Sequence, residues 1–402
     1  MTDVLTHMPP MLFGKELQEA LSVLPKYDLS IRTASTAERL IELNRLYDIY
    51  CPSPMSEEIY CKLYLALLRS LQKKQTKTAI VQGNLNRQGI TNGIIGGSDS
   101  FTILGMSGIG KSSAISRAIS LIAPKSLIVT SEPYSRIAPI ITVQTPYDCS
   151  VKGLLLEILR ETDKALGTDY HSYAIRARAP TDALIGSVSN VCLHSVGLLI
   201  LDEFQNVCGK NGANLMGVLL NLINSSGISV ALVGTLETKA FFSEASFQLS
   251  RRSLGLEYGS LPLGEYFIDL CRVLTSYLYV KCDFTLTDEI VHWLYQHSNG
   301  ITSVVVSLIK DAQEIAILDG SETLSIVSLN KAYNQRLALL HNHINIKEVK
   351  HPSVKTKPIS VQPLTEMDEE NPITDAIAES KKNNGDLMSL IRSKIGVIEV
   401  QI

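Results

Sequence analysis

The sequence is poor in the features that mark membrane-bound, secreted and zinc-binding proteins. No apolar run approaches the roughly 18 residues that a membrane-spanning helix needs. The first residues do not show the basic stretch followed by an apolar stretch that a secretory signal has. The seven cysteines include no CxxC pair and no zinc-finger spacing with histidine. We therefore expect buried, reduced thiols in a cytoplasmic protein that contacts no membrane.

Charge is also scarce and nearly balanced. Charged residues make up 19% of the 402 residues, and the formal net charge is −3. This balance argues against a globally basic nucleic-acid coat protein, although 37 Lys and Arg residues still allow a local basic strip. Hydrophobic residues make up 45%, so the chain can bury a sizeable core. At about 150 residues per domain, the length predicts two or three structural units.

The order of apolar patterns predicts an α/β core between two helical parts. Apolar residues recur at helical spacing over 38–47 and 56–72. From Phe101 onward, short apolar strands alternate with helices, including candidate helices over 214–223 and 240–249. This alternation predicts a mostly parallel sheet flanked by helices. Helical stripes return from about Leu261, over 267–279, 288–296 and 302–318, and proline and charge dominate after His351.

These changes of pattern predict four parts. They are an N-terminal helical extension (1–95), an α/β nucleotide-binding core (96–260), a small helical lid (261–345) and a flexible tail (346–402). Within the tail, residues 384–398 carry Leu and Ile at helical spacing and are a candidate partner-binding helix.

One motif carries strong chemical information. Residues 105–112, Gly-Met-Ser-Gly-Ile-Gly-Lys-Ser, fit GxxxxGK[ST] between a predicted buried strand and a predicted helix. Backbone N–H groups of such a loop point at phosphates, Lys111 would neutralise β/γ-phosphate charge, and the Ser112 hydroxyl would ligate Mg²⁺. The expected nucleotide-binding residues are Gly105, Ser107, Gly108, Ile109, Gly110, Lys111, Ser112 and Ser113.

Three further elements follow in the order that an ATP-hydrolysing enzyme would need. An apolar strand ends in Asp202-Glu203, where Asp202 would join the Mg²⁺ site and Glu203 would activate the attacking water. Thr235 ends another apolar strand, where a γ-phosphate sensor is expected. Arg251 and Arg252 are candidate arginine fingers for the ATP of a neighbouring subunit. Because Glu203 favours water as the acceptor, a small-molecule kinase is disfavoured.

These elements in this order resemble an AAA+ ATPase. Finer runs resemble the TnsC/TniB family, the ATP-dependent target-selection regulators of heteromeric DNA transposons, including CRISPR-associated ones. The runs are Ile49-Tyr-Cys-Pro-Ser-Pro-Met-Ser-Glu-Glu-Ile-Tyr60, residues 99–111, Thr145-Pro-Tyr-Asp-Cys-Ser-Val-Lys-Gly-Leu154 and Leu201-Asp-Glu-Phe-Gln-Asn206. The resemblance spans roughly residues 35–340 and does not extend to the tail.

The resemblance implies an ATP- and Mg²⁺-dependent protein that assembles on duplex DNA without sequence preference, as a hexameric ring or helical filament. A target-selection protein would recruit it, it would recruit the transposase, and hydrolysis would time disassembly. In the cell it would associate with the nucleoid when bound to DNA.

In this family, DNA contacts come from the start of the helix after the second core strand and from the following loop. These positions match Lys152 and Thr168, and Arg176 is a further candidate in the same segment. A lysine beside Ser150 at a helix N-terminus suits a phosphate contact. One position departs from the pattern, because Ser303 aligns where the lid helix usually supplies a basic residue. Hydrolysis is therefore expected to be slow or partner-dependent.

Two other functions remain open from the sequence. A helicase loader or replication initiator of the AAA+ group would also bind DNA, although no initiator-type helix-turn-helix is evident. A nucleotide-switched signalling NTPase normally carries a repeat sensor, and the roughly 57 residues after position 345 are too few for one.

Overall fold

The computed structural model describes residues 4–75, 100–131, 134–147, 150–207, 217–219, 221–223, 226–239 and 253–338. The chain divides into two compact units, Met1–Ile346 and Lys347–Ile402, and the second lies outside the described residues. Arg251, Arg252 and the candidate helix at 384–398 also lie outside them. The four-part division therefore stays a prediction. No helix in the described ranges is long and apolar enough to cross a membrane.

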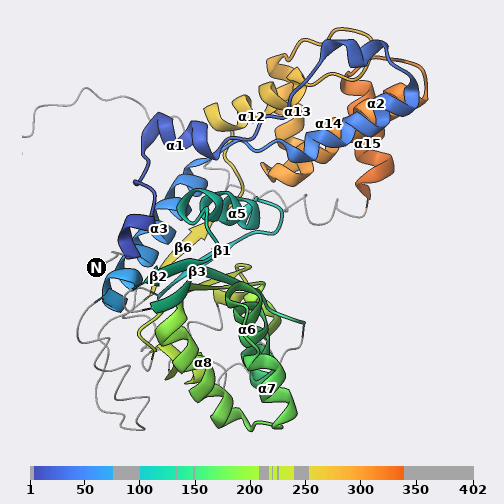
Figure 1. Cartoon of the computed structure of the whole chain (residues 1–402). Helices are drawn as coiled ribbons and strands as arrows, with labels where there is room; N and C mark the ends of the chain where they lie inside the picture. Colours follow the sequence, from blue (N-terminus) through green and yellow to red (C-terminus); the bar gives the residue numbers. More distant parts are fainter. Residues whose placement is uncertain are drawn as a thin grey trace, which may run out of the picture. The chain divides into compact units, whose positions relative to one another are not determined.

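A six-stranded sheet forms the centre of the first unit, in the order β2-β3-β4-β5-β1-β6 (Figure 1). All neighbouring strands run parallel except β2 and β3. The strands are β1 (Ser100–Gly105), β2 (Ile128–Ser131), β3 (Tyr134–Gln144), β4 (Val196–Asp202), β5 (Ser229–Gly234) and β6 (Ser253–Tyr258). If β1, β3, β4, β5 and β6 are numbered one to five, their order is 5-1-4-3-2, the order of an AAA+ core. The predicted α/β fold class is confirmed.

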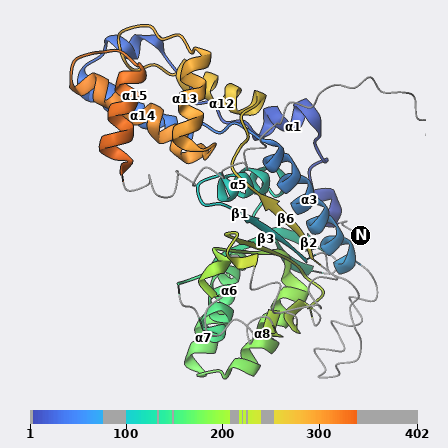
Figure 2. The ribbon, with the colours of Figure 1, turned by 180° about the vertical axis from the view of Figure 1, so that it is seen from behind.

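Helices cover both faces of this sheet (Figures 1 and 2). On one face pack α3 (Pro54–Gln75) and α5 (Lys111–Ile122), with α1 (Gly14–Leu21) against them. On the other pack α6 (Val151–Leu166), α7 (Tyr170–Arg176) and α8 (Thr181–Ser195). Strands β1 and β5 are buried along their whole length, which explains their nearly continuous apolar sequence.

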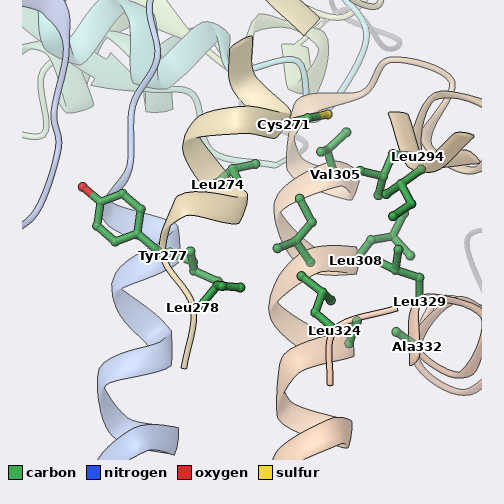
Figure 3. Close-up of a cluster of buried hydrophobic side chains, with 14 of the residues drawn as sticks. Cys271, Leu274, Tyr277, Leu278, Leu294, Val305, Leu308, Leu324, Leu329 and Ala332 are labelled. Atoms are coloured by element: carbon green, nitrogen blue, oxygen red, sulfur yellow. The ribbon is translucent and has the colours of Figure 1, made fainter. Parts of the chain in front are cut away.

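A second group of helices follows the sheet in the chain and has its own apolar core. It comprises α12 (Glu265–Ser276), α13 (Asp288–Ser298), α14 (Thr302–Leu318) and α15 (Ile326–Arg336). Figure 3 shows side chains from these helices meeting, among them Leu274, Leu294, Leu308 and Leu329, all buried. The apolar stripes over 267–279, 288–296 and 302–318 predicted the first three helices.

The N-terminal segment packs on both the sheet and this helical group. Helices α1 and α3 belong to the core of the sheet, whereas Leu43 and Leu46 are buried in the core shared by α12–α15. We call residues 24–49 the N-terminal strap. It contains two short 3-10 helices, η2 (Leu29–Thr33) and η3 (Leu43–Asp48), and the helix α2 (Thr36–Glu42) between them. The strap begins and ends at one antiparallel bridge, in which Val23 and Tyr50 exchange N–H···O bonds of 3.0 and 2.9 Å.

Several elements differ from the sequence-based expectation. The single helix expected over 38–47 is instead α2 followed by 3-10 turns from Leu43, and a capping box of Ser35 and Glu38 fixes its start. Strand β6 was not predicted, because its alternation of Leu254, Leu256 and Tyr258 is short; Leu256 and Tyr258 join the core. Helices α7 and α8 were also not predicted, whereas α1 and α15 lie in segments that were predicted to be helical without bounds of their own. The predicted helices over 214–223 and 240–249 lie partly or wholly outside the described residues.

Candidate functional site: a phosphate-binding loop and an acidic strand end

The phosphate-binding loop joins β1 to α5 and requires its glycines. Gly108 and Gly110 have φ of +81° and +93°, in the left-handed region that favours glycine. A Cβ on Gly105 would lie 2.7 Å from Ile109 Cδ1 and 2.9 Å from the Tyr258 carbonyl oxygen. Helix α5 begins at Lys111, so its unpaired N–H groups lie at the end of the loop, as anion binding requires.

Lys111 supplies the positive charge of the loop. Its Nζ donates hydrogen bonds of 2.8 Å to the carbonyl oxygens of Gly105 and Met106. Burial lowers the pKa of Lys111, while the carboxylates of Glu203 and Asp202 act in the opposite direction. The amine therefore lies between the loop and the acidic end of β4.

Ser112 and Asp202 meet although 90 residues separate them in the chain. The Ser112 hydroxyl donates to Asp202 Oδ2 at 3.0 Å, and Asp202 Oδ1 accepts from the backbone N–H of Glu203 at 2.9 Å. A hydroxyl beside a carboxylate suits Mg²⁺, which prefers oxygen ligands and keeps several waters. Among the described residues, no cluster of three or more His, Cys, Asp or Glu could hold a metal ion.

Glu203, Gln205 and Thr235 form a second polar group at the same edge of the sheet. Glu203 follows β4 directly and has a φ of +54°. Gln205 Nε2 donates to Glu203 Oε2, and Gln205 Oε1 accepts from the Thr235 N–H at 3.3 Å. Thr235 Oγ1 is buried and has no hydrogen-bond partner among the described residues. The sequence placed Glu203 and Thr235 in this site but assigned no role to Gln205.

The start of helix α14 contacts the phosphate-binding loop. The backbone N–H of Ser303 and the hydroxyl of Thr302 both donate to the Gly108 carbonyl oxygen, at 3.1 and 3.0 Å. A Cβ on Gly108 would collide with Ser303 Oγ. Ser303 thus lies against the loop without a basic side chain. Lys310, further along α14, forms ion pairs with Asp311 and Glu314.

The three candidate DNA-contact residues do not lie together. Lys152 is exposed in the first turn of α6, where Ser150 Oγ accepts from the Gly153 N–H at 3.1 Å. Thr168 follows the other end of α6, which has 16 residues and is therefore about 24 Å long. The Thr168 hydroxyl donates to Asp163 Oδ1 at 2.6 Å. Arg176 is exposed at the end of α7, the helix that follows Thr168 in the chain.

The loop geometry, the Ser112–Asp202 pair and the strand order are those expected of the nucleotide site of a P-loop ATPase. Residues 97–254 match the family model described as bacterial TniB protein. This match agrees with the resemblance read from the sequence.

Comparison with solved structures found several similar folds of low sequence identity. The ORC2 protein of Aeropyrum pernix in its ADP form is 16% identical, with 79% of this chain and 77% of that chain covered and a TM-score of 0.40. The ORC1 protein of Aeropyrum pernix in complex with DNA is 12% identical, with 84% and 79% covered and a TM-score of 0.42. A point mutant of Thermotoga maritima RuvB is 12% identical, with 81% and 82% covered and a TM-score of 0.34. No curated protein sequence matches the chain.

Proposed function

We propose that this ATPase is a regulator of DNA transposition, because residues 97–254 match the family model of the bacterial TniB protein. In the ATP-bound form it assembles on duplex DNA, as a hexameric ring or helical filament, and marks the target. A target-selection protein recruits it, and it recruits the transposase. The observation that carries the enzymatic part of this proposal is the contact of Ser112 with Asp202, which is followed directly by Glu203.

The residues of the site suit hydrolysis by water. Lys111 would exchange its two carbonyl acceptors for phosphate oxygens, and Mg²⁺ held at Ser112 and Asp202 would neutralise phosphate charge when bound. Glu203 would accept a proton from water as the water oxygen bonds to the γ-phosphorus and the bond to the β-phosphate oxygen breaks. ADP and phosphate are then the products, and their release would end the assembled state.

The α6 segment suits a backbone contact with DNA. Lys152 is exposed at a capped helix N-terminus, where both the side chain and the helix dipole favour a phosphate. Thr168, at the opposite end of α6, and Arg176, at the end of α7, are candidates for a second contact. Phosphate contacts carry no sequence information, so the binding would be largely sequence-independent.

Assembly would complete the catalytic site. Arg251 or Arg252 of one protomer would reach the γ-phosphate bound to the next and stabilise the charge that develops during hydrolysis. The contact of Ser303 with the loop also supports completion of the site by assembly. The start of α14 brings no cation to the loop, so a neighbouring protomer would have to supply the positive charge. Hydrolysis would then be slow in the isolated chain and faster in the assembly.

Electron microscopy of the protein with a duplex of about 60 base pairs and a non-hydrolysable ATP analogue tests this proposal. We expect nucleotide-dependent rings or filaments on DNA, which Lys111→Ala abolishes by removing the charge that binds the phosphates. Lys125→Ala, at an exposed lysine after α5, is the matched control and should assemble normally. Glu203→Gln should assemble with ATP itself and fail to disassemble.

Three outcomes would contradict parts of the proposal. Monomers that bind ATP but ignore DNA would exclude a transposition regulator and favour the signalling switch. Assemblies that form equally with Lys111→Ala would exclude gating by ATP. Stable binding of a replicative helicase, with no effect on an adjacent transposase, would favour a helicase loader.

A further inference from the structure

We propose that Gln205 is a positioning residue for ATP hydrolysis, which links the carboxylate of Glu203 to the end of strand β5 at Thr235. This inference rests on the proposed role of Glu203 as the base. It adds that Gln205 orients the Glu203 carboxylate and that this orientation depends on the position of Thr235.

The amide of Gln205 has one orientation that satisfies both neighbours. Nε2 donates to Glu203 Oε2, and Oε1 accepts from the backbone N–H of Thr235 at 3.3 Å. A flipped amide would place its oxygen against the carboxylate and its NH₂ group against another N–H donor. A flip of the Gln205 amide would therefore remove both contacts.

The surroundings of the amide restrict its position further. A Cβ on Gly234, the last residue of β5, would lie 3.1 Å from Gln205 Oε1 and 2.8 Å from Thr238 Oγ1. The absence of a side chain at Gly234 thus provides the space in which the amide reaches Thr235. Asn206 attaches the same turn to β3, because its Nδ2 donates to the Thr145 carbonyl oxygen at 2.9 Å. The turn that carries Gln205 is held from two sides.

Glu203 needs such a partner because its backbone does not fix its side chain. It lies outside β4 at a φ of +54°, and the chain continues into the short 3-10 helix η4 (Phe204–Val207). The contact at Oε2 holds one oxygen of the carboxylate and leaves Oε1 as the acceptor of the water proton. A misplaced base reduces catalysis steeply even when its chemistry is unchanged.

The other end of the link lies where a γ-phosphate would be sensed. Thr235 Oγ1 is buried without a hydrogen-bond partner among the described residues, so a phosphate oxygen would satisfy it. A movement of Thr235 toward the phosphate would also move the N–H group to which Gln205 is bound. The amide thereby makes the orientation of Glu203 depend on whether the γ-phosphate is present.

A double-mutant cycle on the full chain tests this link. Steady-state ATP hydrolysis and nucleotide affinity are measured for Glu203→Gln, for Gln205→Ala and for the double variant. We expect Gln205→Ala to lower kcat on the order of 10- to 100-fold, with KM and nucleotide affinity unchanged. In the Glu203→Gln background the same change should have no further effect, because Gln205 acts through Glu203.

Two further variants make the experiment specific. Gln205→Glu keeps the length of the side chain but replaces its donor with a second carboxylate, so it should lower kcat at least as much while retaining the folded structure. Gln18→Ala removes another amide–carboxylate contact, from Gln18 Nε2 to Glu57 Oε1 at 2.8 Å, outside the site. It should leave kcat unchanged.

The outcomes separate this inference from the proposed function. Unchanged kcat in Gln205→Ala, or the same fold-loss with and without Glu203→Gln, would overturn the positioning role while the ATPase site stands. Full activity in Glu203→Gln would overturn both the proposed base and the link. A loss of nucleotide affinity in Gln205→Ala would assign Gln205 to binding instead.

Discussion

Burial lowers the pKa of two lysines in this protein. Lys111 lies in the phosphate-binding loop, whereas Lys74 lies near the end of α3 and donates to the Cys192 and Leu193 carbonyl oxygens at 2.8 and 2.6 Å. Those carbonyls belong to the last turn of α8, where a lysine is a favourable cap. Burial nevertheless lowers the pKa of Lys74 from 10.5 to about 8.

This shift predicts a contribution of Lys74 to the pH dependence of stability. Between pH 8 and about 10.5, the unfolded chain keeps a proton on Lys74 that the folded chain has released. The Lys74 contribution to the free energy of unfolding therefore rises with pH in this interval. Urea denaturation from pH 7 to 10.5 should show this rise in the wild type relative to Lys74→Met. Lys125→Met, at an exposed lysine, should follow the wild type. Parallel curves for the wild type and Lys74→Met would contradict the prediction.

Among the elements, helix α6 has its two ends in different environments. The N-terminal end is capped by Ser150 and carries the exposed Lys152. At the C-terminal end, Gly167 is in the left-handed conformation, and Lys164 forms an ion pair with Glu161 at 2.7 Å. The carboxylate of Asp163 also accepts hydrogen bonds there, from the Thr168 hydroxyl and two backbone N–H groups. The first end is therefore the more suitable one for a phosphate.

A pair of lysine variants distinguishes the two ends. Lys152→Ala should weaken binding to duplex DNA uniformly across sequences and reduce the slope of log K against log salt concentration by about 1, as expected for one lost phosphate contact. Lys164→Ala, in the same helix, should change neither quantity. Fluorescence anisotropy with a labelled duplex at several salt concentrations measures both. The opposite result would place the contact beside Thr168 and Arg176.

In the first unit as a whole, the N-terminal strap joins the sheet to the helical group. Arg39 is 1% exposed and binds Glu322 through two hydrogen bonds of 2.6 and 2.7 Å, while also donating to the Tyr279 carbonyl oxygen. Tyr277 donates in return to the Pro25 carbonyl oxygen at 2.9 Å. The strap therefore packs with the helical group, although it precedes the sheet in the sequence.

Breaking the Arg39–Glu322 pair should destabilise the first unit strongly. Arg39→Ala leaves the Glu322 carboxylate without its main partner and should lower the free energy of unfolding by about 3 kcal/mol, measured by urea denaturation. The double variant Arg39→Met with Glu322→Leu removes both charges and should recover most of the loss. A loss below about 1 kcal/mol in Arg39→Ala would indicate a surface-like ion pair and contradict the buried role.

The parts of this protein that depend on contiguous residues could be predicted from the sequence. The phosphate-binding loop, the acidic end of β4, the apolar strands and the start of α6 at Ser150 each follow from residues that are neighbours in the chain. Local backbone preference, capping and strand burial set these features, and all three act over a few residues. The family resemblance rested on the same kind of short run.

Contacts between distant segments required the tertiary structure. The link from Gln205 to Thr235, the contact of Ser303 with Gly108 and the packing of the strap on the lid join residues that are 30 or more positions apart. Nothing near Gln205 in the sequence distinguishes a positioning amide from an exposed one. The sequence around Arg39 likewise does not distinguish a buried arginine from an exposed one on a helix. Their roles arise because packing brings one partner within hydrogen-bond distance and removes water from around both, which no local pattern encodes.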